Sequence, residues 1–90
     1  MPSRFRKDPD AIKDYHFDWS DWLEDGDSID SYTITPSSGI TVDSDSESGG
    51  IVTVWLSGGT ADTSATVTCR IVTTEGRRDD KTMFFEFKPE

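Results

Sequence analysis

Residues 64–74 read Ser64-Ala65-Thr66-Val67-Thr68-Cys69-Arg70-Ile71-Val72-Thr73-Thr74. Small and apolar side chains occupy every second position from Ala65 to Ile71, and polar ones lie between them. A period of two over this length predicts a β-strand with one buried and one solvent-facing side. Glu75-Gly76 then predicts a tight turn, so we expect this strand to pair with the segment that follows.

The same alternation recurs on both sides of this strand. Further strands are expected at residues 12–19, 28–35, 40–42, 51–56 and 82–88, with turn signals every eight to twelve residues. The step from Ile29 to Tyr32 breaks the alternation and predicts a bulge, and residues 43–50 are expected to form a polar loop. The pattern predicts an all-β fold, a small immunoglobulin-like antiparallel β-sandwich of six or seven strands. A small barrel is the alternative.

The segment 14–27 packs four aromatic rings and six carboxylates into fourteen residues. Tyr15, Phe17 and Trp19 share one face of a strand, and residues 20–24 can form one helical turn capped by Ser20 or Asp18. Trp22 and Leu23 are expected to close the end of the sandwich. Because rings favour burial and carboxylates resist it, the segment must keep an acidic fringe in water. That fringe is either simply solvated or docks on a partner.

Ninety residues form one domain. We expect a flexible N-terminal arm at residues 1–11 and the immunoglobulin-like domain at residues 12–90. The arm holds two prolines and three bases, Arg4, Arg6 and Lys7. It is either a frayed terminus or a hook that inserts Phe5 into a neighbour.

The formal charge is −9, with −8 in residues 1–50 and −1 in residues 51–90. An acidic chain repels phosphate backbones, so we expect no nucleic acid and no membrane as partner, and docking on basic protein surfaces instead. Cys69 is the single cysteine, which excludes an intramolecular disulfide. No apolar segment follows the charged residues at the start of the chain, so no signal peptide is expected. We expect the protein to be made in a cytosol-like compartment.

The sequence gives little support for a catalytic or a metal-binding site. His16 and Cys69 are the only histidine and cysteine, and strand parity places the thiol in the core and the imidazole outside. We therefore expect no enzyme, no cofactor and no zinc site. Asp43, Asp45 and Glu47 resemble the start of a calcium loop, but Ser48 and Val54 stand where an EF-hand needs Gly and Glu. A solvated acidic loop is favoured over a surface Ca²⁺ there or at Asp25 and Asp27.

Several motifs resemble those of small tailed-bacteriophage proteins of the fibre–tail adaptor family. They are Asp8-Pro9-Asp10-Ala11-Ile12, Asp14-Tyr15-x-Phe17-Asp18-Trp19-Ser20-Asp21-Trp22-Leu23, Gly39-Ile40-Thr41-Val42-Asp43-Ser44, Ser48-Gly49-Gly50-x-Val52-Thr53-Val54-Trp55-Leu56-Ser57-Gly58-Gly59-Thr60 and Val67-Thr68-Cys69-Arg70-Ile71. The chain departs from that family where Ala65 replaces an aromatic residue, and where Phe84 and Glu86 replace bases. The resemblance implies an immunoglobulin-like, non-catalytic virion part at the tail, neck or capsid surface, made in the host cytoplasm.

We therefore expect an adaptor that joins tail or neck to fibre components through protein–protein contacts, in a symmetric oligomer with other virion proteins. An edge strand could also add to a partner's sheet. The alternatives are a capsid decoration protein and a carbohydrate-binding module that reads glycans through exposed rings. The expected interface residues are the bases and ring of the arm, the acidic turn, and two outward rings: Arg4, Phe5, Arg6, Asp18, Asp21, Trp22, Glu24, Asp25, Asp27, Trp55 and Phe84.

Overall fold

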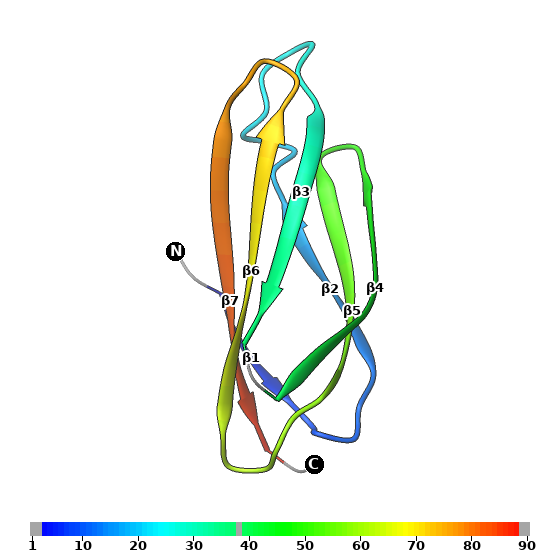
Figure 1. Cartoon of the computed structure of the whole chain (residues 1–90), viewed down its shortest axis with the longest axis vertical. Helices are drawn as coiled ribbons and strands as arrows, with labels where there is room; N and C mark the ends of the chain where they lie inside the picture. The colour runs from blue at the N-terminus through cyan, green and yellow to red at the C-terminus, as the bar shows by residue number, and fades with distance from the viewer. Residues whose placement is uncertain (1–2, 38, 89–90) are drawn as a thin grey trace.

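The computed structural model describes residues 3–37 and 39–88, which form seven strands and their connections (Figure 1). The strands are β1 (Ser3–Lys7), β2 (Lys13–Asp18), β3 (Ile29–Pro36), β4 (Ile40–Ser48), β5 (Ile51–Gly58), β6 (Ser64–Thr73) and β7 (Arg78–Phe87). No helix occurs among the described residues, and so none that could cross a membrane. The all-β prediction is confirmed.

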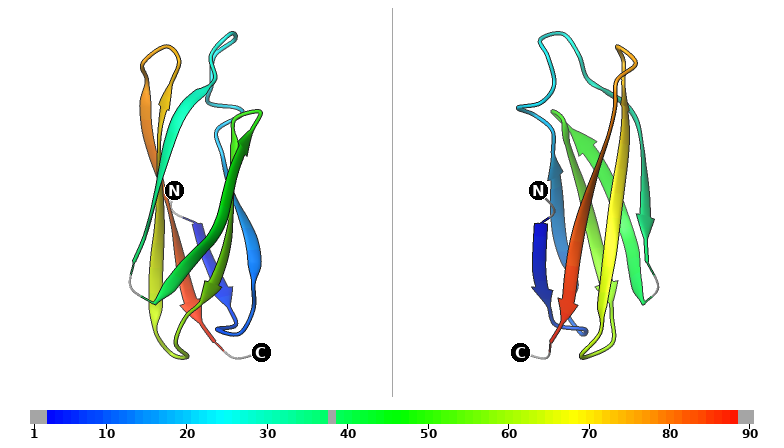
Figure 2. Two further views of the ribbon diagram at one scale, coloured as in Figure 1. Left: turned by 45° about the vertical axis from the view of Figure 1, so that its right-hand side comes forward. Right: turned by 90° about the vertical axis from the view of Figure 1, so that its left-hand side faces the viewer.

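The strands form two stacked sheets (Figure 2). Sheet A has the order β1-β7-β6-β3 and sheet B the order β2-β5-β4. All neighbours are antiparallel except β1 and β7, which are parallel. The orders β2-β5-β4 and β7-β6-β3 match the two sheets of an immunoglobulin sandwich, while β1 joins β7 instead of β2. The predicted sandwich is confirmed, and the two separate sheets exclude the alternative barrel.

The core lies between the sheets and consists of the predicted period-two stripes. β5 contributes Val52, Val54 and Leu56, each without exposed surface. The other apolar residues with no more than 1% of their surface exposed are Phe17, Trp19, Val67, Cys69, Ile71, Phe85 and Phe87. The predicted bulge is also present, as a register shift between Ile29 and Ser31 on β3.

Two segments differ from the sequence predictions. Residues 3–7, expected in a flexible arm, form β1 and pair with Met83 to Phe87 on β7. Residues 43–48, expected in a polar loop, continue β4 along β5 up to the pair Ser48–Ile51. Both segments lie at sheet edges, where backbone hydrogen bonds to one neighbour form a strand without an apolar stripe.

The turn after β2 forms as predicted and is capped by Asp18. One carboxylate oxygen of Asp18 accepts hydrogen bonds from the Ser20 amide (2.8 Å) and the Ser20 hydroxyl (2.6 Å). The Leu23 amide donates to the Trp19 carbonyl at 3.0 Å, which closes one helical turn. Leu23 packs against the core, but Trp22 is 39% exposed and does not close the sandwich as expected.

Candidate protein-interaction surfaces

The first candidate surface is the loop of residues 18–27, which we call the acidic corner. It is built around Trp19, whose side chain has no exposed surface. The indole NH donates to a carboxylate oxygen of Asp79 at 2.8 Å, and the Trp19 amide donates to the Gly50 carbonyl at 2.9 Å. The Lys81 ammonium lies 5.2 Å from the centre of the indole ring and donates to the Asp18 carbonyl. These contacts fix the start of the corner to both sheets.

The far side of the acidic corner is tied to the turn between β6 and β7. One oxygen of Asp27 accepts hydrogen bonds from Ser28 N (2.9 Å), Thr74 Oγ1 (2.8 Å) and Glu75 N (3.1 Å). Burial alone would raise the pKa of Asp27, but the hydrogen bonds donated to its carboxylate outweigh it and lower the pKa. Glu24 forms an ion pair with Arg77 at 2.6 Å. Asp27 and Glu24 therefore hold the corner in place.

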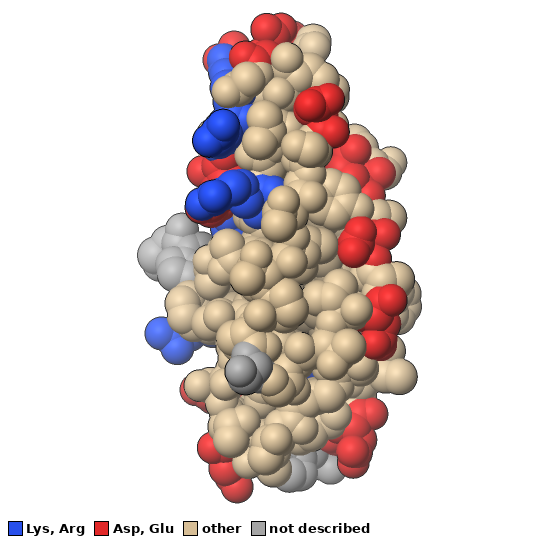
Figure 3. Space-filling view, viewed as in Figure 1, with Lys and Arg blue, Asp and Glu red and all other residues tan. Residues whose placement is uncertain are grey.

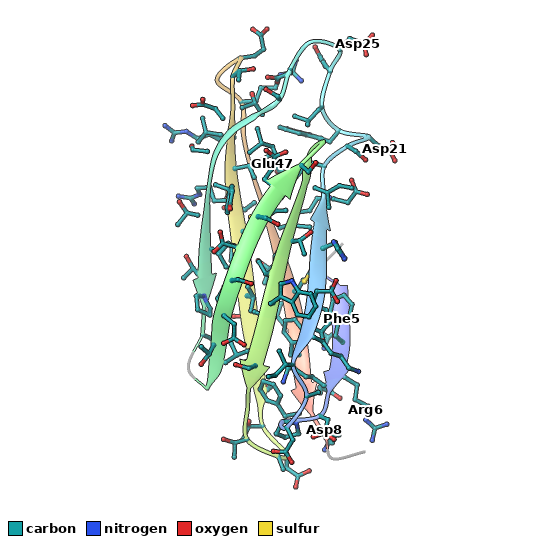
Figure 4. All side chains as sticks on the ribbon, turned by 90° about the vertical axis from the view of Figure 1, so that its right-hand side faces the viewer. Phe5, Arg6, Asp8, Asp21, Asp25 and Glu47 are labelled. Atoms are coloured by element: carbon teal, nitrogen blue, oxygen red, sulfur yellow. The ribbon has the colours of Figure 1, made fainter. Side chains whose placement is uncertain are left out.

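Three side chains of the acidic corner remain free to contact a partner. Asp21, Trp22 and Asp25 are exposed and make no hydrogen bond, ion pair or ring contact with any described residue. Figure 4 shows Asp21 and Asp25 projecting away from the sandwich at one end. Of the six predicted corner residues, these three could bind a partner without breaking an internal contact. Asp18, Glu24 and Asp27 instead support the loop.

The second candidate surface is the outer face of sheet A. Arg4 and Arg6 are exposed there, and the Arg4 guanidinium lies 5.4 Å from the centre of the half-buried Phe84 ring. Phe5 points the other way, and its ring lies 5.0 Å from Tyr15 and 5.5 Å from Phe85 (Figure 4). Phe5, expected to insert into a neighbour, therefore packs into the core of its own chain.

The third candidate surface is the outer face of sheet B. Trp55 lies at its centre on β5, paired across the strands with Asp14 on β2 and Ser44 on β4. Its side chain is 43% exposed. Within the described part of the chain neither Trp55 nor Trp22 contacts another aromatic ring. Exposed coplanar rings would favour a carbohydrate-binding module, but Trp55 lies on the outer face of sheet B and Phe84 on that of sheet A, so these two rings cannot form one platform.

The two sheets differ in charge. The strands of sheet A hold six Lys or Arg and four Asp or Glu, a net charge of +2. The strands of sheet B hold one Lys and five Asp or Glu, a net charge of −4. Figure 3 shows bases gathered on the side of β7 and acids along the opposite side and at the ends. The sandwich therefore presents oppositely charged sides.

The arrangement of His16 and Cys69 does not form a nucleophile–base pair. His16 lies on the outer face of sheet B, where Nδ1 is 2.9 Å from Thr53 Oγ1 and Nε2 is 3.3 Å from an Asp14 carboxylate oxygen. Cys69 lies in the core on β6, and burial raises its pKa to about 12. A thiol that stays protonated at neutral pH is a poor nucleophile.

The acidic residues of β4 do not converge on a common point. Asp43 accepts a hydrogen bond from Ser57, Asp45 from Tyr32, and Glu47 from the Gly50 amide. No group of three or more His, Cys, Asp or Glu that could hold a metal ion occurs among the residues the structure describes. The carboxylates of β4 serve as acceptors for neighbouring strands and turns.

The most deeply buried charge among the described residues, Lys7, was not predicted from the sequence. Lys7 has no exposed surface, and its ammonium donates to the carbonyls of Asp8 (3.1 Å), Ala11 (2.7 Å) and Gly58 (2.9 Å). Desolvation lowers its pKa. Phe5 and Lys7 lie two residues apart on the inner side of β1, and that spacing was the available signal.

In a comparison with models of protein families, one model matches residues 7–86 of the chain. That family is described as the podophage GP4 fiber-tail adaptor protein gp77. The chain belongs to this family. The matched region of the Gp77 family begins at the buried Lys7 and ends within β7, so it includes the acidic corner and nearly all of both sheets. No curated protein matches the chain.

Membership of the Gp77 family confirms the expected resemblance to phage fibre–tail adaptors. It implies a location in the phage virion and is consistent with a structural adaptor role and with binding to other tail or fibre proteins. The family favours the tail over the capsid, and therefore an adaptor over a decoration protein.

Proposed function

We propose that this protein is a non-catalytic adaptor that links tail or neck proteins to fibre proteins through direct contacts. The observation that carries the proposal is the acidic corner. Its backbone is fixed by Trp19, Asp27 and Glu24, while Asp21, Trp22 and Asp25 are exposed and have no partner among the described residues. A rigid loop with an unpaired indole and unpaired carboxylates is a preorganised binding surface.

The chemistry of the acidic corner indicates its partner. Residues 18–27 hold five carboxylates and no base, so a basic surface on a tail or fibre protein is the complementary partner. Trp22 would enter an apolar pocket within that surface, because exposed tryptophans are frequent binding hot spots. The carboxylates around it would set the orientation and the association rate.

The test measures binding of the purified protein to the recombinant tail and fibre proteins of the same phage. We expect Asp21→Lys to weaken binding at least about tenfold, because it places like charges opposite each other, and Trp22→Ala to weaken it by a similar factor or more. Asp10→Lys is the matched control, since it makes the same charge change in an exposed loop outside the corner.

Two further measurements complete this test. Circular dichroism must show that the variants fold like the wild type. Binding should also weaken as salt is raised from about 0.15 M to about 1 M, because screening weakens contacts between exposed charges. Equal binding by Asp21→Lys, Trp22→Ala and Asp10→Lys would show that the acidic corner is not the docking surface.

A further inference from the structure

The two outer faces of the sandwich carry charges of opposite sign. We call the outer face of sheet A the basic face and that of sheet B the acidic face. On the basic face Arg70 is neutralised by Asp80, with contacts of 2.8 and 3.1 Å. Arg6 and Arg78 are exposed, and neither makes an ion pair with a described residue. These two guanidinium groups are available to an acidic partner.

The acidic face has complementary features. Asp14 and Asp43 are exposed on it, and the contacts to their carboxylates come from His16 and from the Ser57 hydroxyl. Each carboxylate therefore keeps its charge available for a cation. Trp55 lies between β2 and β4 at the centre of the face, and an indole ring is the aromatic surface that binds guanidinium best.

We propose that the basic face of one copy packs on the acidic face of a second copy of this chain. Arg6 and Arg78 would meet the carboxylates of the neighbour, and one guanidinium would lie over Trp55. Because the two faces lie on opposite sides of the sandwich, a pair of copies still has one free basic face and one free acidic face with which to extend the assembly. Such a head-to-tail contact builds a closed ring or a filament.

The dimensions of the molecule are sufficient for this contact. The sandwich is 43 Å long and 19 to 23 Å across, so each broad face offers roughly 800 Å², about what each partner contributes to a standard-size interface. The net charge of −9 opposes association at long range. At about 0.15 M salt the Debye length is about 8 Å, so this long-range repulsion is largely screened. The interaction energy then depends mainly on the charged groups that contact each other across the interface.

The test uses sedimentation velocity of the purified protein alone, so its outcome does not depend on what the acidic corner binds. Variant one carries Arg6→Glu and Arg78→Glu, which reverse the basic face. Variant two carries Asp14→Lys and Trp55→Ser, which disable the acidic face. Lys13→Glu and Asp10→Lys are the controls, because they make charge changes of the same sign at exposed positions outside both faces.

We expect the wild type and both controls to form dimers and larger species as the concentration rises to about 1 mM. Each face variant alone should associate at least about tenfold more weakly. An equimolar mixture of the two variants should regain the dimer that each variant alone has lost, since one intact basic face and one intact acidic face remain to pair.

Three results would overturn the proposal. One is a wild type that stays monomeric at about 1 mM. Another is a face variant that associates as well as its control. The third is a variant that still dimerises alone while the mixture gains nothing, because that indicates a contact between like faces.

Discussion

At the scale of single residues, the least expected feature is the buried ammonium of Lys7. An unpaired charge in a protein interior is costly. Here all three ammonium protons are donated to backbone carbonyls, and the ring of Phe87 lies 5.9 Å away. Two of those carbonyls belong to the segment after β1 and one to the end of β5. Lys7 therefore joins the first strand to sheet B at one end of the sandwich.

Replacement of Lys7 tests this role. Lys7→Met keeps the length of the side chain but removes the hydrogen bonds to the carbonyls of Ala11 and Gly58, while the Asp8 carbonyl keeps the Ala11 amide as a donor. We expect a loss of about 2–4 kcal/mol in the free energy of unfolding, measured by urea denaturation. Lys13→Met, at an exposed position of β2, is the control and should change stability by no more than about 0.5 kcal/mol. Equal effects of the two substitutions would contradict the assignment.

A second residue-scale prediction concerns Tyr32, which joins the edges of the two sheets. Its hydroxyl donates to an Asp45 carboxylate oxygen at 2.6 Å, and that hydrogen bond, with burial and the charge of Asp45, raises the tyrosine pKa to about 12. Because the folded pKa exceeds the unfolded value of about 10, the stabilisation is complete below pH 10 and is lost as the pH rises toward 12.

The pKa of Tyr32 can be measured from the chemical shift of its Cζ carbon. We expect titration near pH 12 in the wild type and a return toward 10 in Asp45→Asn, which removes the charge. A wild-type midpoint near 10 would show that the hydrogen bond does not form in solution.

At the scale of elements, the strands with an apolar stripe were predictable and the edge strands were not. Apolar and polar side chains alternate regularly along β6 and most of β7. The pairing of these strands and the outward position of Phe84 could therefore be predicted from the period of two. The acidic run of β4 has no stripe, and β1 is a five-residue strand that pairs with residues near the other end of the chain. Both depend on hydrogen bonds to a distant neighbour, which no local pattern encodes.

The residues of the candidate surfaces also fall into those that could be predicted from the sequence and those that could not. The outward rings Trp55 and Phe84 could be placed from alternation. The supports of the acidic corner could not, because Arg77, Asp79 and Lys81 reach it from β7 and the turn before it. Sequence alone therefore identified the corner as acidic and aromatic, but it did not separate its structural carboxylates from its free ones.

The docking of the acidic corner on the turn between β4 and β5 gives a third prediction. Gly50 and Gly76 have almost the same φ, +87° and +88°. A Cβ at Gly50 would lie 2.8 Å from Leu23 Cδ1 and 3.3 Å from Ser20 Cα, whereas a Cβ at Gly76 would meet nothing within 4 Å. Gly76→Ala should cost about 1 kcal/mol for the backbone conformation alone.

Gly50→Ala should lower the free energy of unfolding by roughly 1–2 kcal/mol more than Gly76→Ala does, because the acidic corner must shift away from the turn between β4 and β5. Thermal unfolding followed by circular dichroism measures both variants. If the two substitutions lowered stability equally, the corner would not be packed on this turn as described.

At the scale of the whole molecule, the three candidate surfaces lie on different parts of the sandwich and differ in charge. The acidic corner lies at one end, and the two oppositely charged faces lie along the sides (Figure 3). The chain belongs to a family of phage fibre–tail adaptors, and we infer that the end contacts a tail or fibre protein while the sides contact neighbouring copies. The small sandwich would then serve as a rigid spacer with separate binding surfaces.

The most direct test is a cryo-EM reconstruction of the tail of the phage that carries this protein, at a resolution that shows side chains. We predict that Asp21, Trp22 and Asp25 contact a basic surface of another tail or fibre protein. A map in which the acidic corner of every copy faces solvent, with the tail and fibre proteins bound elsewhere, would contradict the account.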